Sequence, residues 1–207
     1  IKEEYLLSGA LEQTNESYAI AKIAGMKLCS ALKTQYGFDA ISLMPTNLYG
    51  EGDNYHYTNS HVMPAMIRKF YEAKIKGIDT VNLWGTGSPK REFLFVDDLA
   101  EASIFILENV SIENKLLYDN NNYNGVINVG TGIDISIKEL ANLISSIIGY
   151  KGKIYWDQSK PDGTPRKLLD VSKINQLGWF AKTNLKAGIE KTLESFVNEL
   201  KSGTIRI

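Results

Sequence analysis

Segments with helical periodicity alternate with short apolar runs along this chain. Small and apolar residues recur every three or four positions after Asn15 and Ser17, two candidate helix caps. We therefore expect a helix over residues 18–36, ended by Gly37. Small side chains let another element approach closely, so this helix face predicts packing against a sheet. The positions that carry the pattern are Ala21, Ala24, Gly25, Leu28 and Leu32.

Short apolar runs mark the expected strands. Residues 39–44 form one such run, which Pro45 stops, so residues 45–50 leave the carboxyl end of that strand. Open α/β sheets bind ligands at such ends. Further strands are expected at residues 80–84, 91–96 and 126–129 and near Ile154.

Cap signals and periodicity predict the remaining helices. One runs over about residues 62–75 and tolerates Pro64 in its first turn. Another is capped by Asp97 or Asp98 and extends to about Glu108. Strands that alternate with helices predict an α/β fold with parallel pairing. Further helices are expected between a Ser136–Glu139 capping box and Ile148, and twice near the C-terminus.

Composition narrows the class of protein. The 207 residues are 43% apolar, which is enough to build a core, and the formal net charge is −1. There is no basic surplus to indicate a nucleic-acid or anionic-membrane partner. Cys29 is the single cysteine, and no Cys/His cluster has the spacing of a zinc site. We expect a cytoplasmic protein with no metal site and no membrane association.

The pentapeptide Tyr18-Ala-Ile-Ala-Lys22 places a phenol and an ammonium one helical turn apart, on one face. A positive charge near a phenol favours the phenolate, and such a phenol can exchange a proton with a sugar oxygen during hydride transfer. An accidental Tyr-x-x-x-Lys is the alternative, because the chain has 11 tyrosines and many lysines.

A glycine-rich phosphate-binding turn is missing from the sequence. The Gly-x-Gly pairs at Gly50, Gly85 and Gly130 lack the third glycine, and none follows a first strand, so we interpret them as ordinary turns. Either the Tyr-Lys couple is accidental, or the phosphate-binding turn precedes Ile1.

Seven segments resemble, in order, the extended short-chain dehydrogenase/reductase family, and they cover essentially the whole chain. The match begins about a third of the way into such a protein, so the glycine-rich turn, and a Ser and a Cys that the family carries, are expected before residue 1. The segments are Tyr18-Ala-Ile-Ala-Lys22, Met44-Pro-Thr-Asn-Leu-Tyr-Gly50, Asn59-Ser-His61, Arg91-Glu-Phe-Leu-Phe-Val-Asp-Asp98, Asn128-Val-Gly-Thr-Gly132, Lys160-Pro-Asp-Gly-Thr-Pro-Arg-Lys167 and Leu177-Gly-Trp179.

The resemblance is strongest to NADP-dependent enzymes that epimerise GDP-4-keto-6-deoxy-D-mannose at C3 and C5 and reduce C4. It implies that Tyr18 protonates the sugar O4, that Lys22 holds the nicotinamide ribose, and that His61 acts as acid and base in epimerisation. From the residues alone, His61 could equally be a polar loop residue or a helix cap. Another nucleotide-sugar epimerase, a 4,6-dehydratase and a non-catalytic GDP-sugar-binding piece are the alternatives.

Binding residues are likewise implied by the resemblance. Lys69 stands where the family often has Arg, so Arg68 next to it is a possible replacement for the diphosphate contact. Trp84 could instead be a core residue, and Asp162 could simply shape a turn. The NADP(H)-binding residues are Lys22, Pro45, Thr46, Asn47, Leu48 and His61. The GDP-sugar-binding residues are Lys69, Trp84, Arg91, Asp162 and Lys167.

Two domains are expected, both α/β. Residues 1–50 and 91–132 would be the remainder of a Rossmann-type, doubly wound NADP-binding domain, and residues 51–90 and 133–207 a smaller nucleotide-sugar-binding domain. The resemblance implies a homodimer formed through a helix such as residues 18–36. Without the phosphate-binding turn, the 207 residues are expected to bind NADPH poorly and to turn over little.

Overall fold

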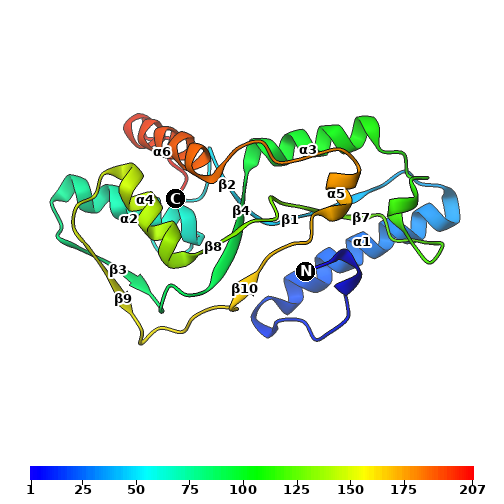
Figure 1. The fold of residues 1–207 in the computed structure, drawn as a ribbon, viewed down its shortest axis with the longest axis horizontal. Helices are drawn as coiled ribbons and strands as arrows, with labels where there is room; N and C mark the ends of the chain where they lie inside the picture. The colour runs from blue at the N-terminus through cyan, green and yellow to red at the C-terminus, as the bar shows by residue number, and fades with distance from the viewer. The chain divides into compact units, whose positions relative to one another are not determined.

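The computed structural model describes residues 1–207 as two compact units (Figure 1). Unit 1 comprises Ile1–Thr46, Leu99–Gly132 and Leu169–Phe180, and unit 2 comprises Asn47–Asp98, Ile133–Leu168 and Ala181–Ile207. These boundaries differ from the expected domains in three places: residues 47–50 and 91–98 belong to unit 2, and residues 169–180 to unit 1. The binding roles of the two domains stay predictions.

Unit 1 contains one parallel strand pair, a small hairpin and helices. β1 pairs with β7 in parallel, with Ser42 opposite Val126. In Figure 1, α1 and α3 lie on opposite sides of this pair. The elements are 3₁₀ turns at Glu3–Tyr5, Gln13–Asn15 and Lys115–Leu117, then α1 (Glu16–Tyr36), β1 (Ser42–Pro45), β5 (Tyr118–Asp119), β6 (Asn122–Tyr123), β7 (Val126–Val129) and α5 (Ser172–Gln176), with α3 (Val96–Asn109) beginning in unit 2.

The expected first helix is confirmed, but its caps and its packing face are not. Gly37 ends α1 in the left-handed conformation, at φ 69°. Asn15 occupies the N-cap position without a side-chain cap, and its amide nitrogen donates to Glu12. Gly25 would have no atom within 4 Å of an added Cβ. The predicted close packing of this small-residue face is therefore wrong, and the half-buried positions are Ala19, Ile23, Met26, Cys29, Ser30, Leu32 and Lys33.

The asparagine-rich segment at residues 118–123 forms a small hairpin. β5 and β6 pair antiparallel, and Asn120 and Asn121 between them have φ values of 48° and 66°. Two consecutive left-handed residues are typical of the type I′ turn, which asparagine tolerates because its short side chain bonds locally. The rings of Tyr118 and Tyr123 make an edge-to-face contact across the strands, with centroids 5.3 Å apart and planes inclined at 70°.

Unit 2 contains a four-stranded mixed sheet and a second parallel pair. β4 lies between β10 and β2, parallel to both, and β8 pairs with it antiparallel. β3 pairs with β9 in parallel. The elements are β2 (Asn47–Tyr49), α2 (Val62–Lys76), β3 (Thr80–Trp84), β4 (Lys90–Phe95), β8 (Asp134–Ser136), α4 (Ile137–Ile148), β9 (Lys153–Asp157), β10 (Arg166–Lys167) and α6 (Leu185–Ser202).

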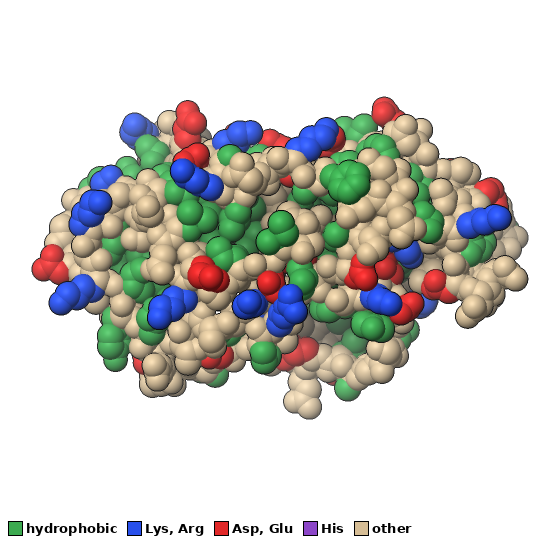
Figure 2. All heavy atoms as spheres, in the orientation of Figure 1, with side chains coloured by type: hydrophobic (Ala, Val, Ile, Leu, Met, Phe, Trp, Pro, Cys, Tyr) green, Lys and Arg blue, Asp and Glu red, His purple; other side chains and the backbone are tan.

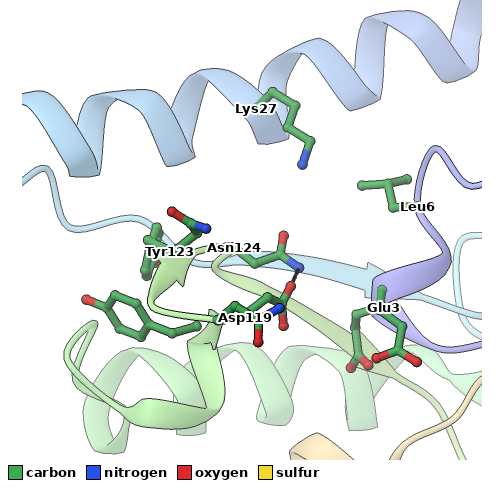
Figure 3. A pocket seen from close by; sticks show the side chains of 10 residues that line it. Glu3, Leu6, Lys27, Asp119, Tyr123 and Asn124 are labelled. Atoms are coloured by element: carbon green, nitrogen blue, oxygen red, sulfur yellow. Dashed lines mark hydrogen bonds between the residues drawn. The ribbon is translucent and has the colours of Figure 1, made fainter.

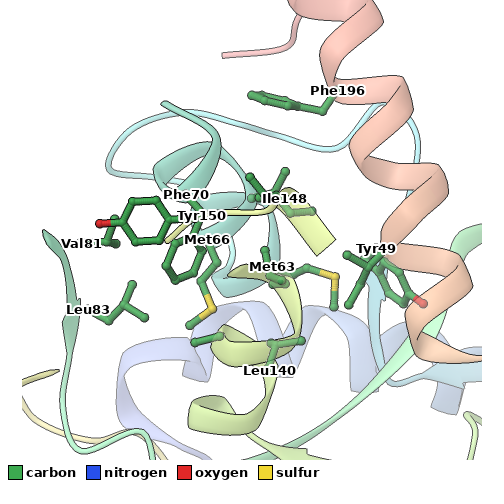
Figure 4. Packing of buried hydrophobic residues seen from close by; sticks show 14 of the residues in the cluster. Tyr49, Met63, Met66, Phe70, Val81, Leu83, Leu140, Ile148, Tyr150 and Phe196 are labelled. Carbon is green, nitrogen blue, oxygen red and sulfur yellow. The ribbon is translucent and has the colours of Figure 1, made fainter. Parts of the chain in front are cut away.

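Packing of α2, α4 and α6 against the strands forms the core of unit 2 (Figure 4). Phe70, Leu140 and Phe196, one from each helix, are almost wholly buried in it. α4 begins with the predicted capping box, in which Ser136 and Glu139 satisfy each other's backbone donors. Each of these helices buries one face, so its apolar residues recur every three or four positions. This recurrence is the pattern from which the helices were predicted.

Asp98 lies inside the first turn of α3 and does not cap it. Its carboxylate accepts hydrogen bonds from the backbone N–H of Lys182, the backbone N–H of Thr183 and the Thr183 hydroxyl, at 2.8–3.1 Å. Only 4% of Asp98 is exposed. One buried carboxylate therefore fixes the segment that leads into α6.

Replacing Asp98 by Ala should lower the free energy of unfolding by about 2–4 kcal/mol, because three donors lose a buried charged acceptor. Urea unfolding measures the change. Asp97→Ala is the control, since Asp97 is exposed in the same turn and should cost less than about 1 kcal/mol. Equal losses in the two variants would contradict this role of Asp98.

Charged side chains of both signs are interspersed on the face drawn in Figure 2. No group of three or more His, Cys, Asp or Glu side chains is arranged to hold a metal ion. The helices are also too short or too polar to cross a membrane.

Candidate active site

Tyr18 and Lys22 lie side by side on the first two turns of α1, in unit 1. The Lys22 Nζ is 5.6 Å from the centroid of the Tyr18 ring. Tyr18 is 67% exposed, so a ligand can reach its hydroxyl. The structure places both side chains on one face of α1, as the four-residue spacing predicted. Their catalytic role stays a prediction.

His61 is the N-cap residue of α2, in unit 2, where the sequence predicted a helix start. Its backbone is extended, its carbonyl accepts from Ala65, and its side chain makes no cap bond. The imidazole is exposed. Burial raises the pKa of the nearby Asp53 carboxyl, and His61 opposes that rise, so the two groups interact electrostatically. Sequence reasoning missed Asp53, which precedes His61 in a polar loop.

A pocket of about 220 Å³ lies in unit 2. It gathers residues from segments far apart in the sequence, including four of the predicted binding residues: Asn47, Trp84, Arg91 and Asp162. Apolar residues from the β3–β4 turn and two helix starts complete it. The sequence did not single out these other lining residues, which are Val62, Gly87, Pro89, Ile137, Pro161 and Gly163.

Trp84 stands exposed at the end of β3, so the alternative of a core tryptophan is wrong. It is 70% exposed, and the Lys160 Nζ lies 5.8 Å from the centroid of its ring. A flat aromatic surface next to a cation can stack on a nucleotide base. The side chain is therefore placed to act at the rim of the pocket.

Asp162 fastens the 160–165 segment to the β3–β4 turn. Its carboxylate accepts from the Thr86 backbone N–H at 2.9 Å and from the Thr86 hydroxyl at 2.7 Å, which holds its pKa below the usual range. Gly85 makes room for it, because an added Cβ there would lie 2.2 Å from the carboxylate and φ is 75°. Asp162 thus shapes the turn, as one of the two alternatives supposed, and it also lines the pocket.

Arg91 and Lys167 lie opposite each other in the β4–β10 pair. The Arg91 guanidinium donates to the Lys90 carbonyl at 2.7 Å, and partial burial lowers its pKa. Gly163 lies against it, since an added Cβ would be 3.1 Å from Arg91 Nη2. Arg91 lines the pocket, whereas Lys167 is a second cation on the neighbouring strand and is not one of the lining residues. Two neighbouring cations are suited to a diphosphate.

Lys69 and Arg68 differ in what they can reach. Lys69 is exposed, and its Nζ lies 3.4 Å from the Asn82 carbonyl at the edge of β3. Arg68 is buried and already bonded to Tyr55 and Glu72. Arg68 therefore cannot replace Lys69 in a phosphate contact, because a buried paired guanidinium is not free to turn to solvent.

The predicted nicotinamide-contacting segment is extended rather than a turn. Pro45 ends β1, only Thr46 intervenes, and Asn47 and Leu48 begin β2. The backbone N–H of Thr46 donates to Val129, and the Asn47 amide donates to the Glu92 carbonyl at 2.8 Å. Both halves of this segment therefore pair with neighbouring strands, β1 with β7 and β2 with β4.

A second, polar cavity of about 590 Å³ lies in unit 1 and holds none of the predicted site residues (Figure 3). Lys27 points toward it from α1, while Glu3 and Asp119 lie on the opposite side. Asn124 donates to Asp119 at 2.6 Å. The predicted residues thus form two groups, Tyr18 with Lys22 in unit 1 and the pocket residues with His61 in unit 2.

Parallel strand pairs connected through helices, with ligand-suited side chains at strand ends, define a Rossmann-type α/β protein. Residues 1–130 match the model of the NAD dependent epimerase/dehydratase family, and the chain belongs to that family.

Known GDP-sugar enzymes are similar to this protein over nearly the whole chain. "Probable GDP-L-fucose synthase 1" of Oryza sativa subsp. japonica is 53% identical, covering 98% of this chain and 58% of the relative. A GDP-6-OMe-4-keto-L-xylo-heptose reductase from C. jejuni is 37% identical, with a TM-score of 0.89, covering 96% of this chain and 65% of that structure. A GDP-L-fucose synthetase from Naegleria fowleri bound to NADP is 26% identical, with a TM-score of 0.85, covering 100% and 63%. The chain therefore spans about three fifths of the length of these proteins.

Proposed function

We propose that this chain carries the catalytic Tyr-Lys pair and the substrate pocket of a GDP-L-fucose synthase, which epimerises GDP-4-keto-6-deoxy-D-mannose at C3 and C5 and reduces C4 with NADPH. The gathering of Asn47, Trp84, Arg91 and Asp162 around one pocket carries the proposal. The identity of 53% to a probable GDP-L-fucose synthase supports it.

In this proposal the pocket binds the GDP group. Trp84 offers a flat surface for guanine, and Arg91 with Lys167 neutralises the diphosphate. Lys69 adds a third positive charge as a point contact, since it lacks the bidentate geometry of arginine. Asp162 holds the loop over the pocket through Thr86. Binding the nucleotide end orients the sugar for reaction.

His61 is the proposed acid–base residue for epimerisation. The 4-keto group acidifies the C3 and C5 hydrogens, because the resulting carbanion is stabilised as an enolate. An exposed imidazole at a helix start can remove or return such a proton near neutral pH. Inversion takes a proton from one face and returns one to the other, so a second acid–base group must act with His61.

Tyr18 is the proposed proton donor to O4 in the reduction. Its neighbour Lys22 stabilises the phenolate left after transfer, through the charge 5.6 Å from the ring. Lys22, Pro45, Thr46, Asn47, Leu48 and His61 are the proposed NADP(H) contacts; Pro45 and Asn47 are exposed and their neighbours partly so. NADPH, when bound, supplies the hydride for C4.

A homodimer and a cytoplasmic location complete the proposal. Ile20 and Leu28, on the outer side of α1, are more than half exposed. Such an apolar helix face is suited to a second copy of the same helix.

Incubation of the full-length protein with GDP-4-keto-6-deoxy-D-mannose and NADPH should consume one NADPH per sugar and yield GDP-L-fucose. Nicotinamide absorbance and NMR of the product measure both. A same-family 4-epimerase or 4,6-dehydratase would convert its substrate without net NADPH use, so unchanged absorbance would contradict the proposal.

A reductase that acts on a GDP-4-keto sugar without epimerising it is the second candidate. The similarity to the C. jejuni heptose reductase favours it, at a TM-score of 0.89. In deuterated water the two candidates separate, because only the epimerase introduces deuterium at C3 and C5.

A further inference from the structure

Arg68 lies in α2 seven residues after its N-cap residue, His61, which is about two helical turns along the chain. Helical side chains tilt toward the N-terminus, so Arg68 reaches back over the loop that leads into His61. It is 8% exposed although it carries a permanent charge. A buried guanidinium is costly unless each of its directions is satisfied.

The Arg68 guanidinium contacts both this loop and its own helix, through two hydrogen bonds and one ring contact. Nη1 donates to the Tyr55 carbonyl at 2.6 Å, and Nε donates to Glu72 at 2.8 Å. The flat face lies 3.5 Å from the centroid of the Tyr57 ring. Tyr57 in turn donates its hydroxyl to Glu72 at 3.1 Å. Arg68, Tyr57 and Glu72 therefore form a closed triangle that ties the loop to α2.

The loop is braced internally as well. The His56 Nδ1 accepts from the backbone N–H of Thr58 and of Asn59, both at 3.1 Å. Asn54 accepts from the His56 backbone N–H and donates to the Asn59 carbonyl. These bonds link residues 54–59 into one piece, which ends two residues before His61.

The far end of the loop is also fixed. The backbone N–H of Tyr55 donates to the Arg206 carbonyl at 2.9 Å. The buried Tyr55 ring packs on Phe196 of α6, with centroids 4.6 Å apart. The loop is thus held by the C-terminal segment through Tyr55 and by α2 through Arg68.

We propose that Arg68 is the positioning residue for His61: it holds the 54–59 loop against α2 and so fixes the direction of the imidazole. The inference rests on the proposed acid–base function of His61. Arginine is required because it must donate in two directions and stack at once, which the single ammonium of lysine cannot do.

The first test is structural and needs no substrate. The chain has only two histidines, so heteronuclear NMR of labelled imidazoles resolves both, and His61→Gln assigns them. Arg68→Lys should shift the His61 resonance. Lys76→Gln is the matched control, because this substitution also removes a cation that pairs with Glu72, but from an exposed position. An unmoved His61 resonance in Arg68→Lys would overturn the proposal.

The second test separates positioning from general stability. Arg68→Lys should slow deuterium incorporation at C3 and C5 by about 10- to 100-fold, with reduction of an epimerised 4-keto sugar nearly unchanged. Equal losses in both steps would overturn the proposal in favour of a merely structural role. Glu72→Gln keeps Arg68 and should also slow exchange at C3 and C5 more than reduction, but by a smaller factor. This second variant keeps the proposal testable if Arg68→Lys folds poorly. Absence of exchange in the unmodified protein would contradict the proposed function instead, while the NMR test stands.

Discussion

Replacing Tyr18 by Phe should slow reduction at C4 by about 10²- to 10⁴-fold, the usual contribution of a positioned proton donor. The substitution removes only the hydroxyl of an exposed side chain. The fold should therefore be unchanged. NADPH oxidation with GDP-4-keto-6-deoxy-D-mannose measures the rate, and deuterium exchange at C3 and C5 should persist because it does not use this hydroxyl.

Tyr36→Phe is the matched control for that substitution. Tyr36 is the last residue of the same helix and is exposed like Tyr18. It should keep full activity. A Tyr18→Phe enzyme that reduces as fast as the control would remove Tyr18 from the mechanism, and the Tyr-Lys couple would then be an accident of composition.

Replacing His61 by Gln should suppress deuterium incorporation at C3 and C5 by about 10²- to 10⁴-fold. Glutamine has a similar reach but cannot carry the proton. Because the His61 side chain makes no cap bond and is exposed, α2 should keep its start. NMR of the sugar in deuterated water measures the exchange, and reduction of an already epimerised 4-keto sugar should remain.

Ser60→Ala tests whether the neighbourhood of His61, rather than its imidazole, is responsible. Ser60 precedes His61 and should tolerate the change with exchange intact. Full exchange in His61→Gln would show that another group moves the protons. Loss of reduction in Tyr18→Phe together with loss of exchange in His61→Gln would assign reduction to a residue of unit 1 and epimerisation to a residue of unit 2.

Local signals predicted most of the elements. β3 and β7 have the expected bounds, and α4 begins at the predicted capping box. The predictions of these segments are confirmed because alternation, helical periodicity and caps depend on residues that are close together along the chain. The Tyr18–Lys22 face belongs to the same class, since a helix fixes the relation between positions i and i+4.

Long-range contacts account for the errors. Asp98 has the sequence of a helix cap, yet its carboxylate binds Thr183, 85 residues away. The small-residue face of α1 was expected to be buried. Which face of a helix is buried depends on the elements that pack against it, and the sequence of the helix alone does not specify them. Arg68 could not be distinguished from a solvated cation by sequence, because burial and its Tyr55 and Glu72 partners come from the fold.

The sequence by itself determined the α/β class, because the order of strands and helices along the chain reveals it. It also determined the Tyr-Lys pair and the helix start at His61, because each depends on spacing within one element. Only the tertiary structure decided which residues share the 220 Å³ pocket, because Asn47, Trp84, Arg91 and Asp162 are brought together by strand pairing and a loop contact. It likewise decided that Arg68 holds a loop and that Asp162 bonds to Thr86. The distances between elements depend on how the whole core packs, and the sequence of a single segment does not specify that packing.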